Sequence, residues 1–177
     1  MAWVDPKTDW QPDQIVTADD MNDIGGNLDA LKQPPTDISS VDHDSDFSTN
    51  STTFVDVDLD VNVATNQFAV QVTTNGGPLL VTFTGSLGHN ASTDTIVYFD
   101  LTLDGLRIGG DNGITMVSCR TGEARNVSFV YWIENISAAT HTVKLQWRTV
   151  SGTATLWAGA GVSGVDVHPQ FSVREVS

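Results

Sequence analysis

From Thr53 onward, the apolar residues recur mostly at every second position, and this period constrains the fold more than any other feature. In the run 55–62, Val and Leu alternate with Asp and Asn, which places one set of side chains on each face of a β-strand. Turn signals such as Asp104-Gly105 separate the runs. The pattern predicts about eight to ten strands, and therefore an all-β jelly roll or β-sandwich over residues 53–177.

The segment 1–33 follows a different pattern and contains a short helix. Thr17 is a good N-cap residue, and Asp20 follows three residues later in the first turn. Four apolar residues then fall on one stripe of this helix, at spacings of three, four and three: Met21, Ile24, Leu28 and Leu31. Pro34 ends the helix. The stripe is expected either to pack on the β domain or to form the seam of a short parallel bundle with other copies.

Before the helix, the chain carries large apolar residues but lacks a core that could bury them. Trp3 and Trp10 lie in an irregular, proline-containing arm, and Ile15 follows them. Trp is favoured as an anchor in protein interfaces. The arm is therefore predicted to dock on another protein, and the alternative is that its tryptophans fold back onto the helix.

Residues 34–52 are polar, acidic and rich in Pro and Ser, which predicts a linker between the helix and the β domain. The acids and His43 within 42–46 favour a solvated loop over a metal site, because hard cations need a fixed set of oxygen ligands. No metal and no cofactor is expected.

The charge balance excludes one class of partner. The chain has 22 acidic and 8 basic residues and a formal net charge of −14. Such a surface repels nucleic acid, and no apolar run is long enough for membrane insertion. No signal peptide is expected at the start of the sequence. The acidity indicates either an ordinary acidic protein or a halophilic one, in which salt screens the repulsion.

No catalytic motif stands out, so the chain is predicted not to be an enzyme. The four histidines are scattered, and Cys119 is expected to be a small buried apolar residue. A hydrolase with a hidden pair of carboxylates stays open as a minor alternative. Four aromatic residues are candidate subunit or ligand contacts: Tyr98, Tyr131, Trp132 and Trp157.

The first thirty residues resemble a short leader found in structural proteins of tailed viruses. The matching residues are Trp10, Ile15, Thr17, Ala18, Asp20, Asn22, Ile24, Asn27 and Leu28. In such proteins the leader attaches a distal domain to the particle. The resemblance implies that Trp3, Trp10, Ile15 and the helix dock on the virion.

The rest of the chain resembles the trimeric jelly rolls, similar to tumour-necrosis-factor domains, that end virion fibres and spikes. The segments that carry this resemblance are 54–57, 99–105 and 141–147. It implies a homotrimeric surface fibre, spike or capsid decoration subunit of a tailed virus, assembled in the host cytoplasm. Its partners would be other virion proteins of the capsid, tail or baseplate, and a glycan of the host surface. The alternative function is a carbohydrate-binding β-sandwich that is not attached to a virion.

Overall fold

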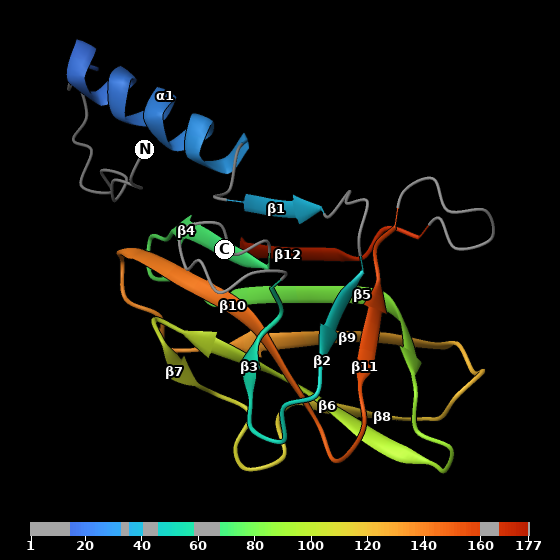
Figure 1. The fold of residues 1–177 in the computed structure, drawn as a ribbon. Coiled ribbons are helices and arrows are strands. Elements are labelled where there is room, and N and C mark those ends of the chain that lie inside the picture. Colours follow the sequence, from blue (N-terminus) through green and yellow to red (C-terminus); the bar gives the residue numbers. More distant parts are fainter. Residues whose placement is uncertain (1–14, 33–35, 41–45, 59–67, 160–166, 177) are drawn as a thin grey trace.

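The computed structural model describes residues 15–32, 36–40, 46–58, 68–159 and 167–176. These residues form two six-stranded antiparallel sheets that face each other, with one helix outside them (Figure 1). The prediction of an all-β sandwich with a short N-terminal helix is confirmed.

The first sheet is built around the long strand β5, which pairs with β9 on one side and with β12 and then β11 on the other. Its outer members are β1, which pairs with β12, and β2, which pairs with β11. The strands of this sheet are β1 (Thr36–Ser40), β2 (Phe47–Thr49), β5 (Leu79–His89), β9 (Arg125–Ile133), β11 (Ala154–Trp157) and β12 (Gln170–Glu175).

The second sheet is centred on the pair β6 and β10. The β6–β7 turn at Asp104-Gly105 has positive φ at both residues, 50° and 84°, which is the hairpin geometry that the Asp-Gly pair predicts. The strands of this sheet are β3 (Val55–Asp56), β4 (Ala69–Thr73), β6 (Thr95–Leu103), β7 (Leu106–Arg107), β8 (Thr115–Cys119) and β10 (Thr140–Thr149).

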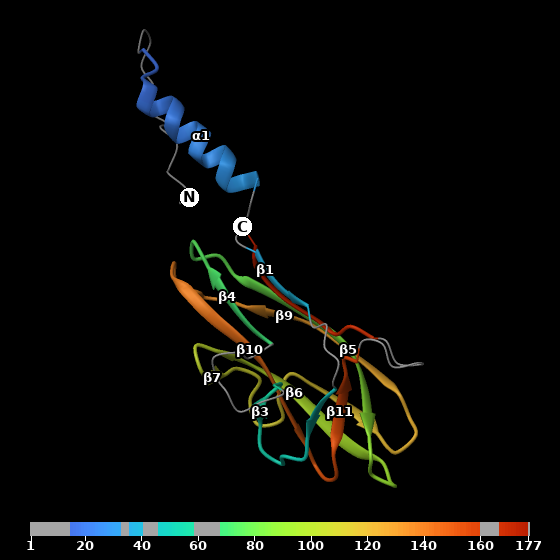
Figure 2. The same ribbon diagram turned by 45° about the horizontal axis from the view of Figure 1, so that its top comes forward.

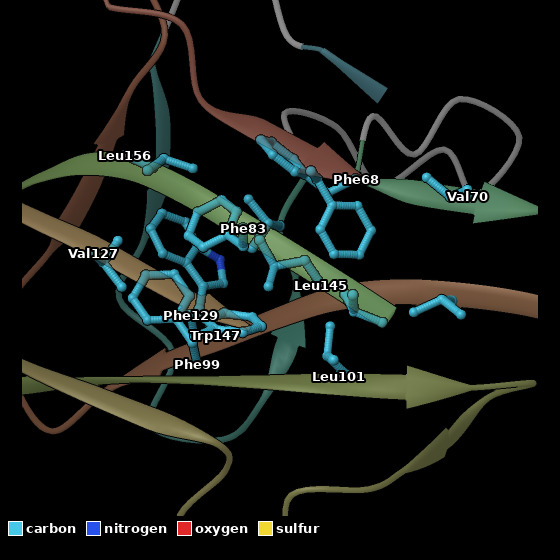
Figure 3. Packing of buried hydrophobic residues seen from close by; sticks show 14 of the residues in the cluster. Phe68, Val70, Phe83, Phe99, Leu101, Val127, Phe129, Leu145, Trp147 and Leu156 are labelled. Carbon is cyan, nitrogen blue, oxygen red and sulfur yellow. The ribbon is translucent and has the colours of Figure 1, made fainter. Parts of the chain in front are cut away.

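Alternate residues of both sheets point inward and make one hydrophobic core (Figure 3). Aromatic rings form its centre. The ring of Phe83 lies 5.6 Å from that of Phe99, and Phe99 lies 6.2 Å from Trp147. On β10 the buried residues Val143, Leu145 and Trp147 alternate with half-buried polar ones, as their period of two predicts.

The predicted linker at 34–52 is wrong for the parts that the structure describes, because they belong to the sandwich. Residues 36–40 form β1 and residues 47–49 form β2. Phe47 is fully buried, with its ring 5.2 Å from that of Phe68. The carboxylate of Asp46 accepts hydrogen bonds from the backbone N–H groups of Ala158 and Gly159. These short polar strands lack the run of alternating apolar residues that reveals the others.

The predicted helix is α1 (Ala18–Lys32), and its predicted start is confirmed. The hydroxyl of Thr17 accepts a hydrogen bond from the N–H of Asp20 at 3.2 Å, and the Asp20 carboxylate accepts one from the N–H of Thr17 at 2.8 Å. This reciprocal cap satisfies two N–H groups at the helix start. In Figures 1 and 2, α1 projects away from the sandwich beyond β1. It is not long and apolar enough to cross a membrane.

Candidate interaction surfaces

The apolar stripe of α1 faces solvent. Met21, Ile24 and Leu28 expose 58%, 47% and 52% of their surface, and Ile15 before the helix exposes 81%. Leu31 lies in the last turn, and its surroundings are outside the described residues, as are Trp3 and Trp10. The sandwich of the same chain does not cover these three helix residues, so the alternative of packing on the β domain is not realised for them. Their role in oligomerisation stays a prediction.

A second surface that exposes large apolar residues lies on the outer side of the first sheet. Its members are the even-numbered positions of β5 (80–86), β9 (126–132) and β12 (170–174), whose odd-numbered neighbours on these strands point mostly into the core. None of the even-numbered positions is Asp or Glu. We call this surface the acid-free face. Val130 exposes 63% and Trp132 50% of its surface.

The structure separates the aromatic residues that the sequence singled out on β9. Tyr131 points inward and packs partly buried against the core, whereas Trp132 stands on the acid-free face. The second apolar side of β9 is therefore left uncovered by the described residues. The contact with another subunit or a ligand that is predicted for Trp132 stays a prediction.

The outer side of the second sheet is charged, and most of its charges are paired within the chain. Lys144 and Gln146 both donate to the carboxylate of Asp56, at 3.0 and 2.8 Å. The fully buried Asp100 pairs with Arg107 at 2.7 Å. These contacts join β3, β10, β6 and β7 across the sheet, which is a structural role that needs no ligand.

Tyr98 takes part in a stack of rings and guanidinium groups at one end of that charged side. The guanidinium of Arg148 lies 4.1 Å from the ring centre of Tyr98 and 5.2 Å from that of Phe54. Arg107 covers Phe54 at 3.9 Å. Among the described residues, Arg148 has no carboxylate partner and donates only to Asn112, at 3.2 Å. A guanidinium held flat in this way keeps donors that could bind an anionic or hydroxyl-bearing group.

Trp157 rests on the backbone of Gly88. A Cβ at Gly88 would lie 2.7 Å from Cζ2 of Trp157, so only glycine leaves room for the indole. The ring is half-buried. This position favours packing within the chain over an open platform for a sugar ring, and the ligand contact predicted for Trp157 is untested.

The structure brings together three residues that sequence reasoning left apart. Nδ1 of His141 lies 2.8 Å from the Asp104 carboxylate, and its Nε2 lies 3.3 Å from the hydroxyl and 3.0 Å from the carbonyl oxygen of Ser137. This Asp-His-Ser order mimics a hydrolase triad. The carbonyl oxygen of Ser137 can only accept a hydrogen bond, so this contact requires a proton on Nε2 of His141. A protonated Nε2 cannot act as the base that takes the proton of the Ser137 hydroxyl. The arrangement therefore favours an imidazolium that holds two loops together.

The environments of four titratable groups, His141, Asp104, His89 and Cys119, agree with structural roles. The hydrogen bond to Asp104 raises the pKa of His141, and that from the N–H of Thr142 lowers the pKa of Asp104. Burial lowers the pKa of His89 and raises that of the Cys119 thiol, which keeps the thiol protonated. Within the described residues, no group of three or more His, Cys, Asp or Glu side chains could hold a metal ion.

No protein-family model matches the sequence, and neither does any curated protein. Among solved structures, infectious bursal disease virus, Gx strain, is similar over 82% of this chain and 37% of that chain, with 12% identity and a TM-score of 0.42. The CBM22-1 xylan-binding domain from Paenibacillus barcinonensis Xyn10C is similar over 82% of this chain and 98% of that one, with 12% identity and a TM-score of 0.38. The chain thus spans little more than a third of the first structure's length. Similarity at this level assigns no function.

Proposed function

We propose that this chain is a non-enzymatic structural subunit of a tailed-virus particle, a homotrimer in which the N-terminal segment attaches to the virion and the β-sandwich projects outward. The observation that carries the proposal is the exposed stripe of α1. Met21, Ile24 and Leu28 lie on one side of a helix of 15 residues that stands apart from the sandwich.

A helix of this length is marginally stable when it is alone in water. Burying one large aliphatic side chain contributes about 1.5–3 kcal/mol, so a seam of several such residues from each copy offsets the cost of ordering the helix. A parallel bundle of three copies buries the stripe and leaves the acids Asp19, Asp20 and Asp23 in solvent. Assembly thus supplies the apolar contact that the sandwich does not give.

The N-terminal leader is the reason for proposing a tailed virus. Its resemblance to structural proteins of tailed viruses runs from Trp10 to Leu28, and the stripe lies within the same residues. A fibre, a spike and a capsid decoration are all compatible with a projecting sandwich. The net charge of −14 favours a host that lives at high salt, where screening lets three acidic copies approach.

The decisive experiment is the mass of the full chain in solution, measured by sedimentation equilibrium in low and high salt. We expect about three times the subunit mass of 19.0 kDa for the natural chain. Ile24→Asp places a charge in the stripe and should give a folded monomer. The matched control Asn22→Asp adds the same charge to the same helix, outside the stripe, and should remain a trimer. A natural chain that is monomeric at all concentrations overturns the proposal.

Virion attachment needs its own test. Antibodies raised against the sandwich should decorate particles of the source virus in electron micrographs. Labelling of the head or of the tail would place the subunit, and unlabelled particles that lack the protein by mass spectrometry would contradict the proposal.

The second candidate function is carbohydrate binding without virion attachment, and the Arg148 stack is what favours it. The guanidinium of Arg148 lies 4.1 Å from the ring centre of Tyr98 and has no carboxylate partner among the described residues, so its donors and the neighbouring ring suit a ligand that carries hydroxyl groups. An array of neutral and acidic oligosaccharides tests this candidate. Binding that is lost in Arg148→Gln and kept in Trp157→Phe would support it, and a monomeric natural chain would favour it over the trimer.

A further inference from the structure

We propose that the acid-free face, centred on Leu80, Val130 and Trp132, is the surface through which the β-sandwich of one copy packs against a neighbouring copy. This inference rests on the homo-oligomer proposed above and adds a second contact to it. The helix stripe would gather the copies, and the acid-free face would set how their sandwiches meet.

The apolar centre of the face is continuous across two strands. Trp132 lies directly opposite Leu80 in the β9–β5 register, and Val130 lies opposite Thr82. Residues directly opposite each other in antiparallel strands have neighbouring side chains, and residues two apart on one strand share a face. Trp132 and Val130 expose half or more of their surface. Exposed Trp beside aliphatic residues is typical of the centre of a protein interface.

Charge decides which kind of partner fits. Two copies that each carry a net charge of −14 repel each other, and a contact that brings carboxylates together adds to this repulsion. The acid-free face is a broad area of sheet without carboxylates, so a neighbouring copy that packs on it meets no repulsion from acidic groups there. Around the apolar centre it carries hydroxyl and amide groups, such as Thr84, Ser128 and Gln170. Such neutral groups can approach an acidic neighbour closely.

The one charged residue of the face is a cation. Arg174 lies in the same row as Leu80 and Trp132, because it pairs with Leu80 in the β12–β5 register. Among the described residues, no carboxylate lies within ion-pair distance of it. An arginine beside an apolar centre complements the acidic surface of a second copy. Because this cation must meet an acidic group of the neighbour, it also restricts how the two copies are oriented.

The edge of the sheet next to the apolar centre is also open. β9 has nine residues and pairs only with β5 among the described strands. Arg125 at its start and Glu134 after its end are the nearest charges that could discourage pairing with another strand. An edge of this length is normally protected in a monomer, and a neighbouring copy would protect it here.

The opposite side of the sandwich is a poorer candidate for this contact. Its ion pairs, Lys144 with Asp56 and Arg107 with Asp100, are already formed within the chain. A partner on that side would have to remove water from these charges without supplying new ones. The two outer sides of the sandwich are therefore chemically unlike, and only the first one suits a copy of the same protein.

The test uses the full chain with one charge added to either side. Trp132→Glu and Val130→Glu place a carboxylate in the apolar centre. Met116→Glu is the matched control, because Met116 is a 62% exposed apolar residue on β8 at the outer side of the second sheet. Sedimentation equilibrium should show at least a tenfold weaker association for both face variants and an unchanged one for the control. Circular dichroism checks that each variant keeps the β fold.

The outcomes separate this inference from the proposed function. A natural chain that trimerises, Ile24→Asp that dissociates and Trp132→Glu that stays a trimer would overturn the acid-free face as a contact and leave the helix seam in place. A monomeric natural chain would overturn both.

A second measurement covers the case in which a glutamate variant fails to fold. Ser128→Cys and Met116→Cys each add an exposed thiol, whereas the natural Cys119 is fully buried. Maleimide labelling of the cysteine at 128 should slow at least tenfold as the protein concentration rises into the assembled range, and labelling at 116 should not change. Equal rates at both positions in the assembled protein would overturn the inference.

Discussion

His141 and Asp104 join β10 to the β6–β7 turn through one short contact, in which Nδ1 lies 2.8 Å from a carboxylate oxygen. The other oxygen of Asp104 accepts a hydrogen bond from the N–H of Thr142, and Nε2 of His141 lies 3.0 Å from the carbonyl of Ser137. Both ring nitrogens thus face an acceptor, which favours the doubly protonated imidazolium.

Stability should depend on pH through this pair. The folded-state pKa of His141 is raised above 6.5, so its contribution is complete below pH 6.5 and is lost as pH rises through the folded pKa. The folded-state pKa of Asp104 is lowered below 3.8, so its contribution is present above pH 3.8 and is lost as pH falls through the folded pKa. His141→Asn should therefore reduce the free energy of unfolding most between these limits and less at alkaline pH.

Urea unfolding at a series of pH values checks this prediction. A difference between the natural chain and His141→Asn that stays constant from pH 5 to pH 9 would contradict the imidazolium contact.

His89 should have the opposite dependence on pH. The N–H of Ala91 donates to Nδ1, so Nδ1 carries no proton and Nε2 bears the hydrogen that faces the hydroxyl of Thr149 at 3.1 Å. Burial lowers the pKa of His89 below 6.5, so its contribution is present above pH 6.5 and is lost as pH falls through the folded pKa. NMR titration of the two rings should find His89 neutral at a pH at which His141 is still protonated. The reverse order would refute both assignments.

The sequence predicts strands well where apolar residues alternate over a long run. β10 (Thr140–Thr149) is such a run of alternating buried and less buried residues, and the Asp104-Gly105 turn has the left-handed backbone that this pair tolerates. β1, with the sequence TDISS, is polar, and its pairing with β12 depends on backbone hydrogen bonds that leave no period in the sequence. A local pattern therefore misses strands that depend on their partners.

The candidate sites likewise differ in whether a local sequence pattern indicates them. The stripe of α1 and the exposed side of β9 are readable as periods of apolar residues within one element. The contact of His141 with Asp104 joins residues 37 positions apart, and the Arg148 stack joins β10, β6 and the segment before β3. Only the register of the folded sheets brings such residues together, so no spacing in the sequence could have indicated them.

Phe47 tests whether the segment once expected to be a linker supports the fold. The side chain is fully buried, so Phe47→Ala should lower the free energy of unfolding by about 3–5 kcal/mol, the range for large aromatic residues in a core. Leu106→Ala, at a residue that is 75% exposed, is the control and should change it by less than about 0.5 kcal/mol. Chemical denaturation measures both. A small change in the free energy of unfolding for Phe47→Ala would mean that the segment acts as a linker and contributes little to the fold.

Asp100 should be costly to remove because it is a buried acceptor with several donors. Arg107 and the N–H groups of Leu101 and Gly109 all donate to its carboxylate. Asp100→Ala leaves these donors without a partner and should destabilise the fold by about 3–5 kcal/mol, the range for breaking a buried ion pair.

Arg107→Lys keeps the positive charge but should still make the fold less stable than the natural chain, because an ammonium cannot reproduce the planar stack on Phe54. Equal stability of Arg107→Lys and the natural chain would show that the stack contributes nothing.

Gly88 and Trp157 give a prediction that can be tested as a double-mutant cycle. Gly88→Ala places a methyl group 2.7 Å from Cζ2 of the indole, so the ring must move, and we expect a loss of about 1–3 kcal/mol with a red shift of the tryptophan fluorescence. In a Trp157→Ala background the same change meets no ring and should be close to neutral. The coupling between the two substitutions therefore measures how firmly the indole is seated on β5. A Gly88→Ala chain with unchanged stability and fluorescence would mean that the ring is free to leave its place, as an exposed ligand platform requires.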